Sequence, residues 1–245
     1  MNKEETDKYY IGETFKLALN GKHTVHPNPM VGAVIVKNGK IMGQGYHLKP
    51  GSPHAEQEAI NDAGKSAHNS TLYINLEPCC HYGRTPPCSD LIIRSKIKRV
   101  VVSSLDPNPV VNGKSIEQLK RSGIEVKIGV LKDDAIKLNQ GFFNKFLLKR
   151  PSVTCKSGIS LDGKISLSNG SSKWITSEES RQDVQMERSI ASLIFSSSKT
   201  VILDDPSLNV RDPLLLKKIL KQPDLAIVDT RLKIPLKSKI FNNSS

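Results

Sequence analysis

Three short runs of the sequence carry the side chains that bind metal ions and transfer protons. They are His54-Ala55-Glu56, Glu77-Pro78-Cys79 and Pro86-Pro87-Cys88. One imidazole and two thiolates make three ligands of the kind that zinc prefers, and a catalytic zinc site keeps its fourth position for water, whereas a structural site has four protein ligands. Zinc lowers the pKa of bound water enough to give hydroxide near neutral pH. We therefore predict a catalytic zinc site formed by His54, Cys79 and Cys88.

Glu56 lies two residues after His54, on the first turn of the same expected helix, close to the metal without being needed as a ligand. The pattern is similar to that of zinc-dependent deaminases, in which His-x-Glu and Pro-Cys place an acid beside the attacking water. Such an acid takes a proton from the water and returns it to the departing amine. We predict that Glu56 is this proton carrier. The alternative is that His54 and Glu56 merely cap a helix and that the cysteines pack or bind a structural zinc ion.

The other cysteines bear on the choice of ligands. Cys80 adjoins Cys79 and is the alternative ligand, but Cys79 is favoured because it directly follows a proline, as the pattern requires. We expect Cys80 to be a small residue that is either buried or placed beside the ligands, and His81 to belong to the loop. Cys155 stands alone. In a chain without a secretion signal, the clustering of the other cysteines favours a metal site over a disulfide framework.

The composition is that of a folded protein with a sizeable core. The 245 residues are 37% hydrophobic and 24% charged, and the mean hydropathy is −0.34. The net charge of +12 favours an anionic partner such as nucleic acid, a membrane surface or a phosphorylated small molecule. The basic residues are scattered rather than gathered in one stripe with aromatic residues, which is typical of a solvated surface. We expect a phosphorylated small molecule as the partner, and no nucleic acid.

Apolar stretches such as Val31 to Val36 are far shorter than the roughly 20 residues that cross a bilayer. The polar N-terminus has no apolar segment typical of a signal peptide. We therefore expect a cytoplasmic protein without a membrane partner. The oligomeric state stays open, with a homo-oligomer among the alternatives.

Hydrophobic periodicity predicts an α/β first domain. A helix over 4–20 precedes a hairpin with strands at 31–36 and 41–46 around Asn38-Gly39. Then follow helices at 54–63, 91–97, 115–121 and 133–149 and strands at 71–76, 99–103 and 124–128. This alternation predicts helices on both faces of a mainly parallel sheet.

A domain boundary is expected where Arg150-Pro151 breaks the last of these helices. It divides the chain into residues 1–150 and 151–245. In residues 151–245 the pattern of apolar residues predicts strands at 153–155, 193–195 and 225–228 and a helix over 178–190. These elements indicate a second α/β domain.

Five motifs together resemble one known family. They are His26-Pro27-Asn28-Pro29, Gly45-Tyr46-His47, His54-Ala55-Glu56, Glu77-Pro78-Cys79 through Pro86-Pro87-Cys88, and Asp106-Pro107-Asn108-Pro109. Over nearly its whole length the chain resembles the bifunctional deaminase/reductase of bacterial riboflavin biosynthesis. The resemblance implies a cytidine-deaminase-like α/β sandwich that hydrolyses the 2-amino group of 2,5-diamino-6-(ribosylamino)pyrimidin-4-one 5′-phosphate. It also implies a dihydrofolate-reductase-like domain that reduces the ribose to ribityl with NADPH.

The same resemblance implies that five residues line the nucleotide pocket. They are Asn28, His47, Arg84, Asp106 and Asn108. Amides and a carboxylate can read pyrimidine edges, and cations can hold phosphate. The alternatives are that the two asparagines serve the backbone of Pro-rich turns and that His47 and Arg84 are surface residues.

In the second domain, the runs Ser160 to Lys164, Ser172 to Thr176 and Asp204 to Leu208 resemble the opening of the family's reductase. The resemblance implies NADP contacts at Gly158, Trp174, Thr200, Asp204 and Thr230, and substrate contacts at Ser172, Arg188, Leu208 and Arg211. The two arginines suit phosphate, with surface salt bridges as the alternative. Trp174 is the only tryptophan, and a place in the core is its alternative.

The resemblance is incomplete at the C-terminal end. The family's reductase continues past the last residue of this chain, and no glycine follows Gly170, so no glycine-rich turn is present there to approach a pyrophosphate. We therefore expect an intact deaminase and a reductase half that is decayed or completed by another chain.

The alternatives are a non-catalytic zinc module that binds a separate reductase, and a nucleic-acid deaminase, which the charge suggests. The eight residues between Cys79 and Cys88 argue against the latter, because its pattern has two.

Overall fold

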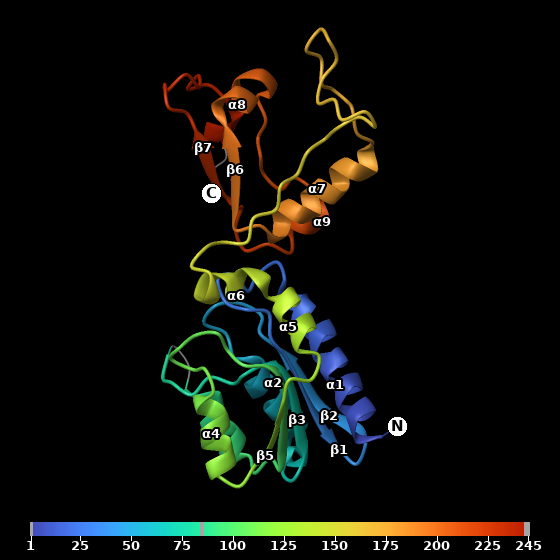
Figure 1. Ribbon diagram of the computed structural model, residues 1–245, viewed down its shortest axis with the longest axis vertical. Helices are drawn as coiled ribbons and strands as arrows, with labels where there is room; N and C mark the ends of the chain where they lie inside the picture. The colour runs from blue at the N-terminus through green and yellow to red at the C-terminus, as the bar shows by residue number, and fades with distance from the viewer. Residues whose placement is uncertain (1, 84–85, 243–245) are drawn as a thin grey trace. The chain divides into compact units, whose positions relative to one another are not determined.

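The computed structural model describes residues 2–83 and 86–242 and divides the chain into two compact units, Met1–Ser152 and Val153–Ser245. Figure 1 shows the course of the chain through both. Arg84 lies outside the described residues. None of the described helices combines the length and the apolar character needed to cross a bilayer.

The first unit opens with α1 (Lys3–Ala18) and a hairpin of β1 (Gly32–Lys37) and β2 (Lys40–Tyr46). The hairpin turns at Asn38 and Gly39, whose φ angles of 52° and 74° suit a two-residue turn of the type that follows the twist of the strands. The predicted helix and hairpin are therefore confirmed.

The hairpin is followed by alternating helices and strands. These are α2 (Ala55–Ala63), β3 (Thr71–Leu76), α3 (Cys88–Arg94), β4 (Arg99–Ser104), α4 (Lys114–Arg121), β5 (Glu125–Ile128), α5 (Lys132–Leu138) and α6 (Gln140–Leu147), with short 3-10 turns at Leu19–Gly21 and Gly64–Ala67. The sheet order is β2-β1-β3-β4-β5. β1 pairs antiparallel with β2 and β3, whereas β4 pairs parallel with β3 and β5. The expectation of a mainly parallel sheet is wrong, because the hairpin enters the sheet and makes half of the pairings antiparallel.

Two predicted helices differ from the observed ones. α3 begins at Cys88, three residues before the predicted start, directly after Pro87. The single helix predicted over 133–149 is two helices, because Asn139 leaves the helical conformation at φ −113° between α5 and α6. The Asn139 side chain accepts a hydrogen bond from the N–H of Met30 and donates one to its carbonyl, at 2.8 and 2.9 Å. A distant backbone contact therefore breaks a helix that local periodicity continues.

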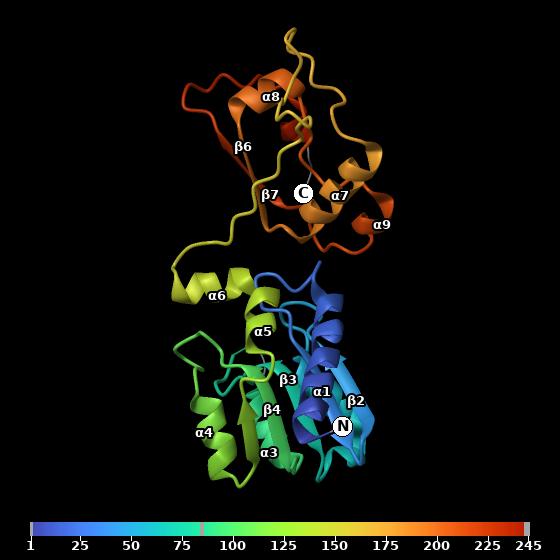
Figure 2. The same cartoon turned by 45° about the vertical axis from the view of Figure 1, so that its right-hand side comes forward.

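The sheet is covered by helices on both faces, as Figures 1 and 2 show. One core lies between the sheet and the helices α2, α3 and α4. The other lies between the sheet and α1, with Leu131 before α5 packed against it. Strands buried on both faces are apolar throughout, which explains the continuous apolar runs in β1, β3 and β4.

Two glycines of β2 allow α2 to lie close to the sheet. A Cβ at Gly43 would lie 2.4 Å from the Ala59 carbonyl oxygen, and one at Gly45 would lie 2.6 Å from the Ala55 carbonyl oxygen. Any side chain there would force the helix away. This close approach fixes the first turn of α2, which carries Glu56 two residues after His54.

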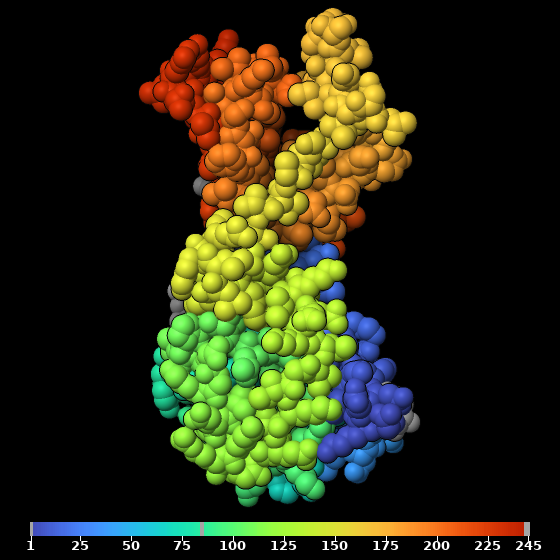
Figure 3. All heavy atoms as spheres, viewed as in Figure 1, coloured from blue at the N-terminus to red at the C-terminus, as the bar shows by residue number. Residues whose placement is uncertain are grey.

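The second unit contains α7 (Glu178–Ile190), β6 (Leu193–Ser197), α8 (Ser198–Asp204), α9 (Pro213–Leu216), β7 (Asp224–Val228) and a 3-10 turn at Lys239–Asn242. β6 and β7 pair in parallel, and Val201, Leu208 and Ile240 form a small core. The predicted helix 178–190 and the two later strands are confirmed. The predicted strand at 153–155 is wrong: residues 151–177, drawn in yellow in Figure 3, form neither helix nor strand and are mostly exposed.

Candidate active site

His54, Cys79 and Cys88 come together from the ends of three elements. His54 directly precedes α2, Cys79 follows β3, and Cys88 begins α3. The Nδ1 atom of His54 lies 3.3 Å from Sγ of Cys88 and 3.6 Å from Sγ of Cys79, and the three ligand atoms lie within 4.8 Å of one another. A tetrahedral zinc ion at ordinary bond lengths separates a nitrogen and a sulfur ligand by about 3.6 Å. The three side chains therefore fit a zinc ion.

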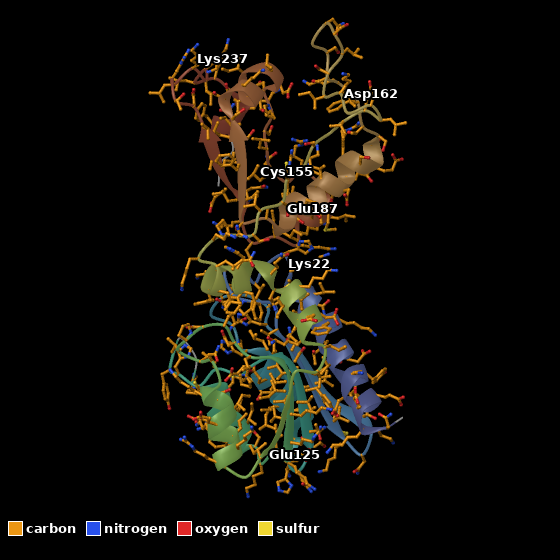
Figure 4. All side chains as sticks on the ribbon, in the orientation of Figure 1. Lys22, Glu125, Cys155, Asp162, Glu187 and Lys237 are labelled. Carbon is orange, nitrogen blue, oxygen red and sulfur yellow. The ribbon has the colours of Figure 1, made fainter. Side chains whose placement is uncertain are left out.

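The alternatives to a metal site do not match this geometry. His54 occupies the N-cap position of α2, but its side chain makes no capping hydrogen bond. Cys80 is not part of the cluster, and its Sγ faces the Val110 carbonyl oxygen at 3.9 Å. Cys155 is exposed and belongs to the second unit, where Figure 4 labels it. Cys79 is the better ligand, as its position after proline predicts.

The electrostatics of the cluster favour one thiolate and one carboxyl group that titrates near neutrality. The hydrogen bond from the Cys88 thiol lowers the pKa of Cys79. Burial raises the pKa of Glu56 to about 7, against the opposing effect of the nearby His54 charge. A carboxyl group with a pKa near the working pH can both accept and release a proton.

A cavity of about 400 Å³ opens over this cluster. Four of the five residues expected to bind the nucleotide line it together with Glu56, namely Asn28, His47, Asp106 and Asn108. The structure therefore brings together residues from three separate loops and from α2. The fifth expected residue, Arg84, lies outside the described part.

His47 is a buried residue that orients Asn28. Its Nδ1 lies 3.1 Å from the Pro53 carbonyl oxygen, which only accepts, so Nδ1 carries the proton and Nε2 accepts from the Asn28 amide at 2.9 Å. Burial lowers the pKa of His47 and so favours this neutral form. The surface position considered for His47 is therefore wrong, and a cationic role toward phosphate does not suit it.

Asp106 and Asn108 form a turn after β4. Oδ1 of Asp106 accepts the N–H of Asn108 at 2.8 Å, and Oδ1 of Asn108 accepts the N–H of Val110 at 3.1 Å. Burial raises the pKa of Asp106 to about 6, although the Asn108 N–H opposes this shift. The backbone role considered for Asn108 is therefore present, and the residue lines the cavity as well.

Two features of the cavity have no counterpart in the sequence patterns. Phe142 of α6 forms part of the lining and contacts the ring of Phe146. Asn75 accepts the N–H of Gly32 and donates to the Met30 carbonyl, both at 2.9 Å, so it holds the chain just after Asn28. The cluster of phenylalanines in α6 was the available signal for Phe142, but nothing local connects it to the zinc motifs.

In the second unit, the expected cofactor residues divide between two regions. Thr200 and Asp204 lie in α8 after β6, and Thr230 follows β7, so they lie beyond the carboxyl ends of two parallel strands, where α/β sheets bind ligands. Gly158 and Trp174 belong to the loop 151–177. Trp174 is 71% exposed, with the Arg181 guanidinium 4.4 Å from its ring centre, so the core position considered for it is wrong.

The expected substrate residues of the second unit gather beside α7, with one exception. Arg188 donates to the Asn209 carbonyl oxygen at 3.0 Å, and the N–H of Arg211 donates to the Gln185 side chain at 2.6 Å. Burial and the nearby Arg211 charge lower the pKa of Arg188, a grouping of like charges that suits an anion. The side chain of Leu208 is in the core, which leaves only its backbone for a ligand. The exception is Ser172, which belongs to the loop 151–177.

Two family models match the chain. Residues 4–104 match the cytidine and deoxycytidylate deaminase zinc-binding region, and residues 151–245 match the RibD C-terminal domain. Among curated proteins, riboflavin biosynthesis protein RibD of Aquifex aeolicus is 50% identical over 238 residues, which are 97% of this chain and 66% of the relative. RibD of Escherichia coli is 43% identical over 93% of this chain and 64% of the relative.

Solved structures agree with these matches. RibD of Acinetobacter baumannii is 44% identical, with a TM-score of 0.93 over 98% of this chain and 68% of that one. A second structure is that of a diaminohydroxyphosphoribosylaminopyrimidine deaminase/5-amino-6-(5-phosphoribosylamino)uracil reductase from Thermotoga maritima. It is 40% identical, with a TM-score of 0.91 over 100% of this chain and 69% of that one. The chain spans just under two thirds of the length of the curated relatives named above.

Proposed function

Because the chain belongs to the RibD family of riboflavin-biosynthesis proteins, we propose that it deaminates 2,5-diamino-6-(ribosylamino)pyrimidin-4-one 5′-phosphate with the help of zinc. The observation that carries this proposal is the convergence of His54, Cys79 and Cys88 beside the buried carboxyl group of Glu56. His54, Cys79 and Glu56 also line the cavity. Three protein ligands leave a fourth position for water, as hydrolysis requires.

In this proposal His54, Cys79 and Cys88 hold Zn2+, which when bound supplies a Lewis acid that makes water nucleophilic near neutral pH. As the water oxygen bonds to C2, Glu56 accepts a proton from the water and passes it to the neighbouring ring nitrogen. It then carries the remaining hydroxyl proton to the 2-amino group. The C2–N bond breaks, ammonia leaves, and C2 gains the carbonyl oxygen of the uracil product. The raised pKa of Glu56 supports a carboxyl group that takes up and releases a proton at neutral pH.

The cavity residues position the pyrimidine in this proposal. Since the Asn28 amide donates to His47, its carbonyl oxygen is left to accept an N–H of the ring. Asp106 and Asn108 bind further polar edges from the opposite loop. Arg84 is proposed to bind the phosphate, as the family resemblance implies.

For the second unit we propose reduction of the ribosyl group with NADPH. The match to the RibD C-terminal domain supports this assignment, and NADPH supplies the hydride. Thr200 and Thr230 would bind the cofactor at the carboxyl ends of β6 and β7, with Asp204, Gly158 and Trp174 as the further cofactor residues. Arg188 and Arg211 would bind the substrate phosphate, with Ser172 and the backbone of Leu208 beside them.

We also propose a cytoplasmic location, because the two cysteines that would bind zinc must stay reduced, which suits a reducing compartment. A homo-oligomer stays a prediction that size-exclusion chromatography with light scattering would test.

The test is an anaerobic assay of the purified, zinc-analysed chain with the diaminopyrimidinone nucleotide, in which ammonia release and NADPH oxidation are followed in the same tube. We expect ammonia release with one zinc ion per chain. NADPH oxidation after deamination would support the second activity and contradict the decayed reductase half expected from the sequence. A zinc-loaded chain that releases no ammonia would refute the deaminase and favour the non-catalytic module.

A further inference from the structure

Glu77 is a buried carboxylate that the mechanism above does not use. It directly follows β3, lies two residues before Cys79, and is 4% exposed. Three groups donate hydrogen bonds to it. The N–H groups of Asp106 and Gly113 donate to Oε2 at 3.1 and 2.9 Å, and the Ser115 hydroxyl donates to Oε1 at 2.8 Å.

Two of these donors lie at the two ends of one loop, and Ser115 lies in the first turn of the helix that follows it. Asp106 lies just after β4, and Gly113 is the N-cap residue of α4. The Glu77 carboxylate therefore joins the two ends of the loop 105–113 by hydrogen bonds. The same loop carries Asp106 and Asn108 into the cavity. Glu77 therefore connects the segment that holds a zinc ligand to the segment that holds two pocket residues.

We propose that Glu77 is a positioning residue, which sets Asp106 and Asn108 at a fixed distance from the zinc ligands so that the bound ring presents its reacting carbon to the attacking water. This inference rests on the proposed deaminase function. It adds a residue that acts through the loop and does not itself touch the substrate.

The chemistry of the contact explains why an acidic residue stands here. All three neighbours donate, and a carboxylate offers two oxygens that only accept. Glutamine can keep the arrangement: its oxygen faces the two N–H groups, and its amide donates to the Ser115 oxygen, which also accepts. Aspartate keeps the charge but is one methylene shorter. Alanine leaves two buried N–H groups without an acceptor.

The experiment uses the full chain, the diaminopyrimidinone nucleotide and four variants: E77A, E77Q, E77D and the control D7A. We expect kcat/KM for ammonia release to fall roughly 10- to 100-fold in E77A with zinc content unchanged, because a shift of about 1 Å in a positioning loop costs this much. E77Q should stay within about threefold of the wild type, whereas E77D should resemble E77A.

Asp7 is a matched control, because it is also a buried carboxylate with several hydrogen bonds but joins α1 to the start of β4, at Arg99. The pocket residues follow the other end of that strand. D7A should therefore lose stability without losing kcat/KM in the folded protein.

Wild-type kcat/KM in E77A would overturn the proposal. Loss of zinc in proportion to loss of activity would also overturn it, because the effect would then lie on Cys79. If E77A does not fold, E77Q and E77D decide. If activity depends on the length of the side chain, so that E77Q is more active than E77D, the positioning role is supported. If activity depends on the negative charge, so that E77D is more active than E77Q, the positioning role is overturned.

Amide hydrogen exchange gives a readout without turnover. Exchange at the N–H groups of Asp106 and Gly113 that is faster in E77D but close to the wild type in E77Q and D7A supports the connection. Exchange in E77D equal to that of the wild type overturns it. If the wild type releases no ammonia, the proposed function fails by itself, and the exchange pattern alone then shows whether Glu77 holds the loop.

Discussion

At the scale of single residues, burial sets the chemistry of the pocket as much as residue type does. Burial raises the pKa of Glu56 to about 7 and that of Asp106 to about 6, and it lowers the pKa of His47. The pocket is thus lined by carboxyl groups that titrate near neutrality and by a histidine that stays neutral. These shifts follow from the desolvation of the charged forms.

Replacing Glu56 with glutamine should remove the proton carrier while keeping the size of the side chain. We expect ammonia release to fall by at least roughly 100-fold, the smaller end of what a general acid–base group contributes. Zinc content, measured by plasma emission spectrometry, should stay at one ion per chain. An unchanged rate would exclude the proton-carrier role.

His47 and Asn28 should behave as one unit. The His47 imidazole orients the Asn28 amide at 2.9 Å. Either H47A or N28A should therefore raise KM about tenfold. The KM of the double variant should be no higher than that of the single variant with the higher KM. The measurement is a double-mutant cycle on KM for the nucleotide. Additive effects would mean that the two side chains contact the substrate independently.

At the scale of elements, α1 is joined to the sheet by a buried ion network. The carboxylate of Asp7 accepts from both terminal nitrogens of Arg99 at 2.7 and 2.8 Å, from Lys127 at 3.0 Å and from the Tyr73 hydroxyl at 3.1 Å. Arg99 also donates to Glu125, which Figure 4 labels at the first residue of β5. The network fixes the helix against three strands.

Stability should therefore depend on the charge of Asp7. Burial acts to raise its pKa, but the hydrogen bonds from Arg99 and Lys127 prevail and lower it from 3.8 to about 2. The folded pKa is below the unfolded one, so this stabilisation is complete above pH 4 and is lost as the pH falls from about 4 to about 2. Asp7→Asn should cost about 3–5 kcal/mol at pH 7 in urea unfolding, because it leaves the buried Arg99 with only the half-exposed Glu125 as a carboxylate partner. A difference from the wild type that does not narrow toward low pH would contradict this.

The contact between α2 and β2 gives a second prediction at this scale. Gly45→Ala should force α2 away from the sheet, since the new Cβ would lie 2.6 Å from the Ala55 carbonyl oxygen and 2.7 Å from the Ala59 nitrogen. We expect weaker zinc binding in chelator competition and a lower Tm. Gly12→Ala is the control: a Cβ there meets nothing within 4 Å in α1, so it should stabilise by about 0.5–1 kcal/mol. Equal effects of the two substitutions would refute the packing argument.

At the scale of the whole molecule, each compact unit has a core of its own, and the described residues that form the zinc cluster and line its cavity belong to the first unit. A fragment of residues 1–152 should therefore fold, bind one zinc ion and release ammonia at a rate within a few-fold of the full chain. Circular dichroism, zinc analysis and the ammonia assay check these three properties. A fragment that folds and binds zinc but does not turn over would mean that the second unit contributes to the first site.

The sequence alone determined the features that depend on neighbouring residues. The zinc ligands and Glu56 are short motifs at the ends of elements, the Asn38-Gly39 turn needs only two residues of positive φ, and α7, β6 and β7 follow from local periodicity.

Only the tertiary structure decided the features that need a partner far along the chain. Asn139 breaks a predicted helix because it binds Met30, His47 is neutral because it is buried between Asn28 and Pro53, and Phe142 reaches the cavity from α6. The hairpin made the sheet half antiparallel through its pairing with β3. Periodicity and propensity describe a residue's immediate neighbours, whereas the burial and hydrogen bonds that set these roles come from segments that the fold alone brings into contact.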